Sequence, residues 1–355
     1  MILKGRNIFL VAGPCSAESR DQLIGTASEL IQKVQPDVIR AGIWKARTRM
    51  NTFEGVGKEG LKWLQEVKTM FGIPVATEVL KPEHVELCID AGIDYVWLGA
   101  RTVVNPFMVQ EICSALKGSN LKIMVKNPVN PDIKLWIGAI ERIFDTGITS
   151  VAAIHRGFST YYSSPYRNMP LWEIPNELRR AFPELPIICD PSHICGRTDC
   201  IQEIAQQALD LEMNGLMIES HYNPLLAKSD KDQQLTPDQL QDILHCIIVR
   251  NRCESLEQKL KNLRNEIDTI DNHLLEILSR RLQIVKEIGK FKKTHQITIL
   301  QSERSKHIFT DRINKGTSLN IDSEFLKTLL KTIHNEAIRI QLDIMKTDSD
   351  SIQTK

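Results

Sequence analysis

Short apolar runs separated by amphipathic stretches fill the first 250 residues of the chain. Eight runs have the length of buried strands, at residues 8–12, 38–41, 75–77, 95–98, 122–125, 151–154, 187–189 and 215–218. Amphipathic segments such as 57–70 and 82–90 lie between them and have the spacing of helices. Eight βα units in about 250 residues predict a (β/α)8 TIM barrel. A doubly wound open sheet is the alternative, and it would place its ligand at one switch point.

The apolar pattern changes after residue 250. Apolar residues follow a four-three spacing from Leu256 to Phe291, which predicts one helix of roughly 38 residues, about 57 Å long. A helix of that length needs a partner to cover its apolar stripe, and helices at 301–314 and 322–345 follow, with a turn predicted at Lys315-Gly316-Thr317-Ser318. We therefore expect a barrel at 1–250, an all-helical domain of three helices at 251–346 and a disordered tail at 347–355.

A polar cluster follows nearly every predicted strand. Because the carboxyl ends of barrel strands share one face, these clusters should all lie around a single rim, where barrel enzymes keep their active sites. The clusters are Gly13-Pro14-Cys15-Ser16, Lys45-Ala46-Arg47-Thr48, Glu78, Gly99-Ala100-Arg101, Lys126-Asn127-Pro128, His155-Arg156-Gly157, Asp190-Pro191-Ser192-His193 and Glu219-Ser220-His221.

Composition narrows the class of protein. The formal net charge of +1 gives no reason to expect binding to nucleic acid or to a membrane surface. No apolar run approaches the roughly 20 residues of a membrane span, and the first residues do not have the pattern of a signal peptide. The eight cysteines form no CxxC pair and lie scattered through the chain, which is typical of a reduced, cytoplasmic protein.

Six cations lie at or just after strand ends. They are Arg40, Lys45, Arg47, Arg101, Lys126 and Arg156. Any one of them alone could form a salt bridge on the rim. Six around one mouth indicate substrates with several negative charges, such as phosphates and a carboxylate.

Four further residues from different strand ends are candidate metal ligands, namely Cys15, His193, Glu219 and Asp230. A set that mixes thiolate, imidazole and carboxylate donors favours a divalent Mn, Fe, Co, Zn or Cu ion over Mg or Ca. Cys15 taken alone is better explained as a buried thiol at a strand end than as a ligand.

The order of these motifs resembles the class I 3-deoxy-D-arabino-heptulosonate 7-phosphate (DAHP) synthases over residues 1–245. The resemblance implies condensation of phosphoenolpyruvate with erythrose 4-phosphate. It also implies a divalent metal held by Cys15, His193, Glu219 and Asp230. Arg40, Arg101, Lys126 and Arg156 match the phosphoenolpyruvate contacts, and Lys45, Arg47 and Thr48 match the aldehyde loop and reaction centre. Ala46 departs from the family pattern, which usually has Pro, and should leave that loop more flexible.

A related family is the alternative for the barrel. The 3-deoxy-D-manno-octulosonate 8-phosphate synthases, which use arabinose 5-phosphate, normally carry Lys-Ala-Asn-Arg-Ser-Ser at this loop. The sequence here reads Lys45-Ala46-Arg47-Thr48 without the Asn. This difference favours the four-carbon sugar.

Basic residues mark one face of the long helix. Arg281 falls on the apolar seam, where burial of its charge would need an anion. Lys292 lies eleven residues later, about 20° away around the helix, whereas Arg264 lies about 100° from Arg281. Arg264 and Arg281 therefore cannot easily serve one pocket on one helix, but they could serve a pocket across a dimer.

Residues 255–345 resemble the all-helical chorismate mutases. The resemblance implies rearrangement of chorismate to prephenate and a homo-oligomer, at least a dimer through the helices. It places Arg264, Arg281, Lys292, Arg304 and Gln341 in the active site, with departures at Gln301, Ser305 and Ala337. Because the two reactions are not consecutive, we expect prephenate or chorismate bound to the helices to regulate the barrel. The alternative is a domain that senses these ligands without turnover.

Overall fold

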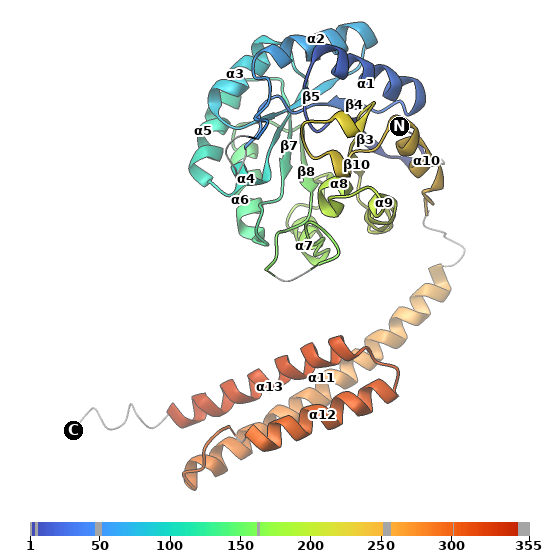
Figure 1. Ribbon diagram of the computed structural model, residues 1–355. Helices are drawn as coiled ribbons and strands as arrows, with labels where there is room; N and C mark the ends of the chain where they lie inside the picture. The colour runs from blue at the N-terminus through green and yellow to red at the C-terminus, as the bar shows by residue number, and fades with distance from the viewer. Residues whose placement is uncertain are drawn as a thin grey trace, which may run out of the picture. The chain divides into compact units, whose positions relative to one another are not determined.

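The computed structural model describes residues 2–3, 6–46, 52–161, 164–250, 257–300 and 302–346. It divides into two compact units, Met1–Asn251 and Arg252–Lys355, which are treated separately below (Figure 1). The tail predicted at 347–355 lies outside the described residues. No helix among the described residues is long and apolar enough to cross a membrane.

The first unit is a closed barrel of eight parallel strands, as predicted (Figure 1). The sheet runs in the order β10-β3-β4-β5-β6-β7-β8-β9, so each strand pairs with its neighbour in sequence and β10 closes on β3. The strands are β3 Phe9–Gly13, β4 Val38–Arg40, β5 Val75–Val79, β6 Tyr95–Leu98, β7 Lys122–Lys126, β8 Val151–His155, β9 Ile187–Cys189 and β10 Gly215–Glu219. A small antiparallel pair, β1 Ile2–Leu3 and β2 Arg6–Asn7, precedes them.

Helices cover the outside of this barrel (Figure 1). They are α1 Arg20–Lys33, α2 Glu59–Phe71, α3 Pro82–Asp90, α4 Ala100–Val103, α5 Pro106–Leu116, α6 Ile133–Phe144, α7 Glu173–Ala181, α8 Pro191–Cys195, α9 Ile201–Asp210 and α10 Pro237–Cys246, with short 3-10 turns η1 Pro224–Leu226 and η2 Lys231–Gln233. N-capping residues fix where several of these helices begin. Asn105 and Asp132 cap α5 and α6, each just before an apolar stretch, and Thr236 forms a capping box with Gln239 at α10.

Two apolar layers hold the barrel together. The larger one lies between the strands and the surrounding helices. The smaller one fills the inside of the barrel with alternate strand residues, Val11, Val38, Ala76, Trp97, Met124, Ile154, Ile188 and Met217. The interior is therefore a packed core rather than a pore, and chemistry is confined to the rim.

The second unit consists of three helices, α11 Glu257–Thr294, α12 Ser302–Ser318 and α13 Ser323–Lys346. The 38 residues of α11 confirm the predicted long helix. Val285 of α11 packs with Ala337 and Ile340 of α13 in a small buried cluster.

The turn predicted at Lys315-Gly316-Thr317-Ser318 is wrong. Helix α12 runs through these residues to Ser318, and the chain turns at Leu319 and Asn320. A Cβ on Gly316 would lie only 2.5 Å from Leu326 Cδ1. The glycine therefore serves close packing of α13 against α12 rather than a turn.

Candidate active sites

The carboxyl ends of the barrel strands bring most of the predicted site residues to one rim. Arg40, Lys126 and Glu219 are the last residues of β4, β7 and β10. Arg156 directly follows β8, and Cys15 follows β3 by two residues. Arg101 and His193 lie on α4 and α8, the short helices that begin just after β6 and β9. Barrel closure thus gathers side chains that are more than 200 residues apart in sequence.

The four candidate metal ligands form two neighbouring pairs. Cys15 Sγ lies 3.2 Å from Asp230 Oδ2, and His193 Nε2 lies 3.8 Å from Glu219 Oε1. Cys15 and Glu219 are fully buried. Across the described residues, no group of three or more Cys, His, Asp and Glu side chains is drawn together tightly enough to hold an ion as it stands. The donor types and the two pairs nevertheless fit a divalent ion that binds thiolate, imidazole and carboxylate.

Asp190 orients the candidate ligand His193. Its Oδ1 accepts the backbone N–H of His193 at 3.1 Å and caps α8, while its Oδ2 lies 2.8 Å from His193 Nδ1. With the Asp190 carboxylate next to Nδ1, the Nε2 atom of His193 faces Glu219. In metal sites, a carboxylate at this position fixes the orientation of the imidazole ring and makes it a more basic ligand. Burial lowers the pKa of His193, which favours the neutral form that binds metals.

Two cations bond directly to candidate ligands. Arg40 Nη2 donates to Glu219 Oε1 at 3.1 Å, and both side chains are buried. Lys45 Nζ lies 2.9 Å from Cys15 Sγ. Burial raises the pKa of the Cys15 thiol to about 12, and the nearby Glu219 adds to the rise against the opposing effect of Lys45. The pKa of Lys45 is raised, because Cys15 and Glu219 outweigh the effect of burial, so the ammonium form is retained.

The remaining cations line the same mouth. Lys126 Nζ donates to Asp190 Oδ2 at 3.1 Å. Arg156 is fixed from two sides, since its backbone N–H donates to Asn127 Oδ1 at 2.7 Å and its Nη1 donates to Asn168 Oδ1 at 2.8 Å. Burial lowers the pKa of Arg156 to about 10, which still leaves it positively charged at neutral pH. These residues add positive charge to the mouth.

Trp97 forms the floor beneath two of these cations. The guanidinium of Arg40 lies 4.8 Å from the centre of its indole ring, and the ammonium of Lys126 lies 5.8 Å from it. Contacts of this kind stabilise a cation over an aromatic face. Trp97 occupies the strand position that faces the barrel interior.

Three further predicted site residues of the barrel are Arg47, Thr48 and Arg101. Arg47 and Thr48 lie outside the described residues. Arg101 is exposed on α4, and its charge contributes to the lowered pKa of Arg156. Sequence reasoning missed the roles of Asp190, Trp97, Arg167 and Gln233. Asp190 belongs to the polar cluster that follows the strand at 187–189, so its role could have been predicted from that position. Arg167 and Gln233 lie far from any strand end in the sequence.

The site residues predicted for the three helices are not all brought together within one copy of the unit. Arg264 is exposed, and Arg281 is half-buried with its Nη1 buried and without a partner among the described side chains. Burial and the nearby Arg312 lower the pKa of Arg281. Gln341 is buried, and its Oε1 likewise has no partner there, while Lys292 Nζ donates to the carbonyl of Ile299 at 2.6 Å. The side chain of Arg304, and with it Ser305 and Gln301, lies outside the described residues.

Gly289 allows α11 and α13 to approach each other at this point. A Cβ there would lie 2.8 Å from Ile344 Cδ1 and 3.3 Å from Gln341 Cγ. The close approach brings Gln341 to the face of α11 that carries Arg281 and Lys292.

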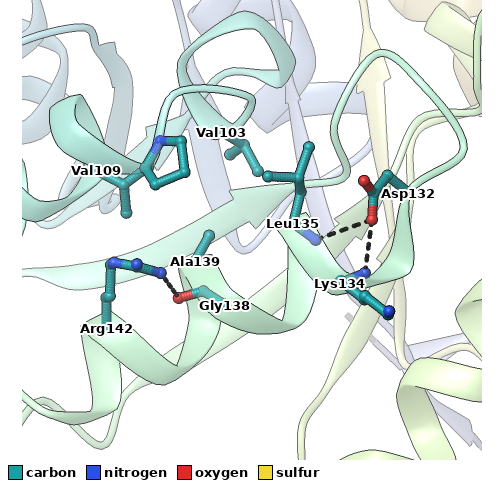
Figure 2. A pocket seen from close by; sticks show the side chains of 9 residues that line it. Val103, Val109, Asp132, Lys134, Leu135, Gly138, Ala139 and Arg142 are labelled. Atoms are coloured by element: carbon teal, nitrogen blue, oxygen red, sulfur yellow. Dashed lines mark hydrogen bonds between the residues drawn. The ribbon is translucent and has the colours of Figure 1, made fainter.

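A separate cavity of about 250 Å³ lies on the flank of the barrel between α5 and α6 (Figure 2). Its polar groups serve α6 itself. Asp132 Oδ1 accepts the backbone N–H groups of Lys134 and Leu135, and Arg142 Nη1 donates to the carbonyl of Gly138, as Figure 2 shows. None of the predicted site residues lines it. This cavity is therefore not a candidate for the predicted chemistry.

Fold and rim together define the first unit as a barrel enzyme domain whose mouth is built for anionic ligands. The chain belongs to the DAHP synthetase I family, because the model of that family matches residues 1–253. The chorismate mutase type II description matches residues 263–342, so the helical unit is a chorismate mutase domain.

Individual relatives agree with this assignment. A phospho-2-dehydro-3-deoxyheptonate aldolase from Thermotoga maritima is 29% identical over 226 residues, which cover 64% of this chain and 64% of that protein. The crystal structure of a T. maritima DAHP synthase superposes with a TM-score of 0.60 at 26% identity, covering 73% of this chain and 70% of that one. A 2-dehydro-3-deoxyphosphooctonate aldolase from Bordetella petrii is 27% identical over 265 residues, covering 69% of this chain and 90% of that protein.

Proposed function

We propose that the barrel condenses phosphoenolpyruvate with erythrose 4-phosphate to give DAHP and phosphate, and that the helical unit rearranges chorismate to prephenate. The observation that carries the first activity is the meeting, at one rim, of the pairs Cys15–Asp230 and His193–Glu219 with the buried cations Arg40 and Lys126 and the half-buried Lys45 and Arg156. The T. maritima relative named for the same product supports it.

Cys15, His193, Glu219 and Asp230 would hold a divalent metal, which when bound supplies Lewis acidity to an aldehyde oxygen. Lys126 and Arg156 bind the phosphate and carboxylate of phosphoenolpyruvate and hold its carbon 3 towards the aldehyde. Lys45, kept as an ammonium, donates a proton to the aldehyde oxygen as the new carbon–carbon bond forms. Water then adds to carbon 2, and phosphate leaves. Arg40, Arg101, Arg47 and Thr48 complete the contacts to the two substrates.

The alternative for the barrel is the synthase that uses arabinose 5-phosphate. Ala46 matches its loop, and the B. petrii relative carries the name of that activity. Phosphate release from phosphoenolpyruvate with each aldehyde distinguishes the two. We expect a higher kcat/KM for erythrose 4-phosphate, and a preference for the five-carbon sugar would assign the barrel to the other reaction.

In the helical unit, Arg264 and Arg281 would clamp the two carboxylates of chorismate in its compact conformer. Lys292 and Gln341 would donate to the ether oxygen as negative charge builds there, and Arg304 would add to the carboxylate contacts. No cofactor is needed. Turnover of chorismate by the full-length protein separates an enzyme from a domain that only binds these ligands.

We propose that this second site is completed by a dimer. In a single copy, the apolar side chains of α11 from Leu260 to Ile284 that form its stripe are left 45–67% exposed. A second copy would cover them and bring the Arg264 of one chain to the Arg281 of the other, which the angle of about 100° between them prevents within one helix.

Prephenate or chorismate bound to the helices would also slow the barrel reaction. Coupling of this kind is typically 1–3 kcal/mol, or roughly 5–150-fold. Titration of prephenate into the condensation assay tests it, with Arg281→Ala as the matched variant. Equal inhibition of wild type and variant, or inhibition of neither, would show that the helical site is not the sensor.

A further inference from the structure

Arg167 lies in the segment between β8 and α7 and is anchored on α8, the helix that carries His193. Its backbone N–H donates to the carbonyl of Cys195 at 3.3 Å. The next residue, Asn168, donates from its backbone to Ile194 at 3.1 Å and from Nδ2 to the carbonyl of His193 at 2.6 Å. A Cβ on Gly196, at φ 71°, would lie 2.6 Å from Arg167 Cβ, so the glycine makes room for the arginine stem.

One nitrogen of Arg167 bonds one carboxylate of the candidate metal site directly and is linked to the other through Gln233. Nη1 donates to Asp230 Oδ1 at 3.0 Å and to Gln233 Oε1 at 2.7 Å. The amide of Gln233, which is 1% exposed, then donates from Nε2 to Glu219 Oε2 at 2.7 Å. Gln233 therefore relays the position of Arg167 to the second carboxylate.

These bonds divide the oxygens of each carboxylate in the same way. Asp230 has Oδ1 tied to Arg167, while its Oδ2 faces Cys15 Sγ at 3.2 Å. Glu219 has Oε2 tied to Gln233, while its Oε1 accepts from Arg40 Nη2 at 3.1 Å and lies 3.8 Å from His193 Nε2. In both carboxylates, one oxygen is held by Arg167 or Gln233, and the other oxygen faces another candidate ligand.

The backbone conformation of Asp230 also calls for contacts that stabilise it. Its backbone is left-handed, with φ 45° and ψ 40°, a conformation that costs most residues with a Cβ roughly 1–2 kcal/mol and an aspartate less. Such strain persists at functional sites when the surroundings fix the residue. The bond from Arg167 is one of the contacts that do so.

We propose that Arg167, acting through Gln233, is a positioning residue that sets the two metal-binding carboxylates in place before the ion arrives. The proposal rests on the proposed metal site. Arg167 touches neither substrate nor metal in this role. Loss of contacts that orient ligands from outside typically weakens metal binding about 10–100-fold.

The sign of the effect separates positioning from simple electrostatics. A cation next to the site repels a divalent ion, so removal of its charge alone would tighten metal binding. Positioning predicts the opposite result. Arg167 has a side chain that is 47% exposed, so its replacement by Met should leave the fold intact.

The test is direct Mn²⁺ binding to the full-length, metal-free protein, followed by electron paramagnetic resonance of the free ion. We expect Arg167→Met and Gln233→Met to weaken Mn²⁺ binding about 10–100-fold. Arg167→Lys should also weaken it, because the ammonium keeps the charge but ends one bond nearer to the backbone than Nη1 and cannot keep both of its bonds. Arg179→Met is the matched control, since Arg179 lies on α7 and bonds the carbonyls of Leu211 and Glu212, which directly follow α9.

The outcomes separate this inference from the proposed function. Unchanged or tighter Mn²⁺ binding in Arg167→Met, with normal binding in wild type, would overturn the positioning role alone. Wild-type protein that neither binds Mn²⁺ nor consumes phosphoenolpyruvate would instead overturn the metal site itself.

Discussion

The two units of this chain assemble charged side chains in different ways. At the barrel rim, the candidate residues come from the ends of several strands of one closed sheet, and buried partners such as Asp190 and Glu219 hold the cations in place. In the helical unit, Arg264 is exposed and Arg281 has a buried nitrogen without a described partner. A barrel can complete a site within one chain, whereas we propose that three helices with an uncovered stripe need a second copy to complete theirs.

Removal of the metal should give the largest difference between the units. We expect chelation, or Cys15→Ala, to lower condensation by about 10³-fold, because Lewis acidity supplies several kcal/mol at the transition state. Chorismate rearrangement should stay within about twofold, since electrostatic catalysis by arginines needs no ion. Phosphate release and chorismate loss are measured on one sample. Full condensation by metal-free Cys15→Ala protein would refute the metal assignment.

Arg281→Ala should have the opposite effect, with loss of the helical activity and no loss of the barrel activity. It should lower chorismate turnover about 10²–10³-fold, since a substrate carboxylate loses its charged partner in the transition state. Uninhibited condensation should be unaffected. Arg339→Ala is a suitable control, because Arg339 pairs with Glu336 and Asp343 on the surface of α13. Normal turnover by Arg281→Ala would show that the pocket lies elsewhere.

Much of this contrast could be predicted from sequence, for a physical reason. Apolar runs of strand length fix the barrel, and the strand ends then place Arg40, Lys126 and Glu219 on the rim. The four-three spacing predicts α11 in the same way. Arg167 and Gln233 could not be predicted, because their bonds depend on loop conformations that have no periodicity. Gly316 was misjudged because a glycine needed for helix packing has the same local signal as a turn.

A smaller effect concerns pH and the barrel alone. Burial, with the nearby Arg156, lowers the pKa of His155 to about 3, compared with about 6.5 in an unfolded chain. The neutral folded form therefore contributes stability that is fully present above pH 6.5 and is lost as the pH falls towards 3. At pH 5 the loss is roughly 2 kcal/mol.

Tryptophan fluorescence can follow this loss in the barrel, because all five tryptophans lie there, at Trp44, Trp63, Trp97, Trp136 and Trp172. The unfolding free energy of wild type should fall between pH 7 and pH 5 by more than that of His155→Phe. An identical pH dependence in the two proteins would contradict a neutral buried His155.

The central claim is that one chain completes the barrel site and two chains complete the helical site. Its most direct test is a dimer of one Arg264→Ala chain and one Arg281→Ala chain, isolated through two different tags. Since one of its two shared sites has both arginines, it should recover about half of the wild-type chorismate turnover per dimer. The matching dimer of Lys45→Ala and Arg156→Ala chains should recover no condensation. Chorismate turnover no higher than in the parent variants, or condensation restored in the barrel pair, would contradict the account.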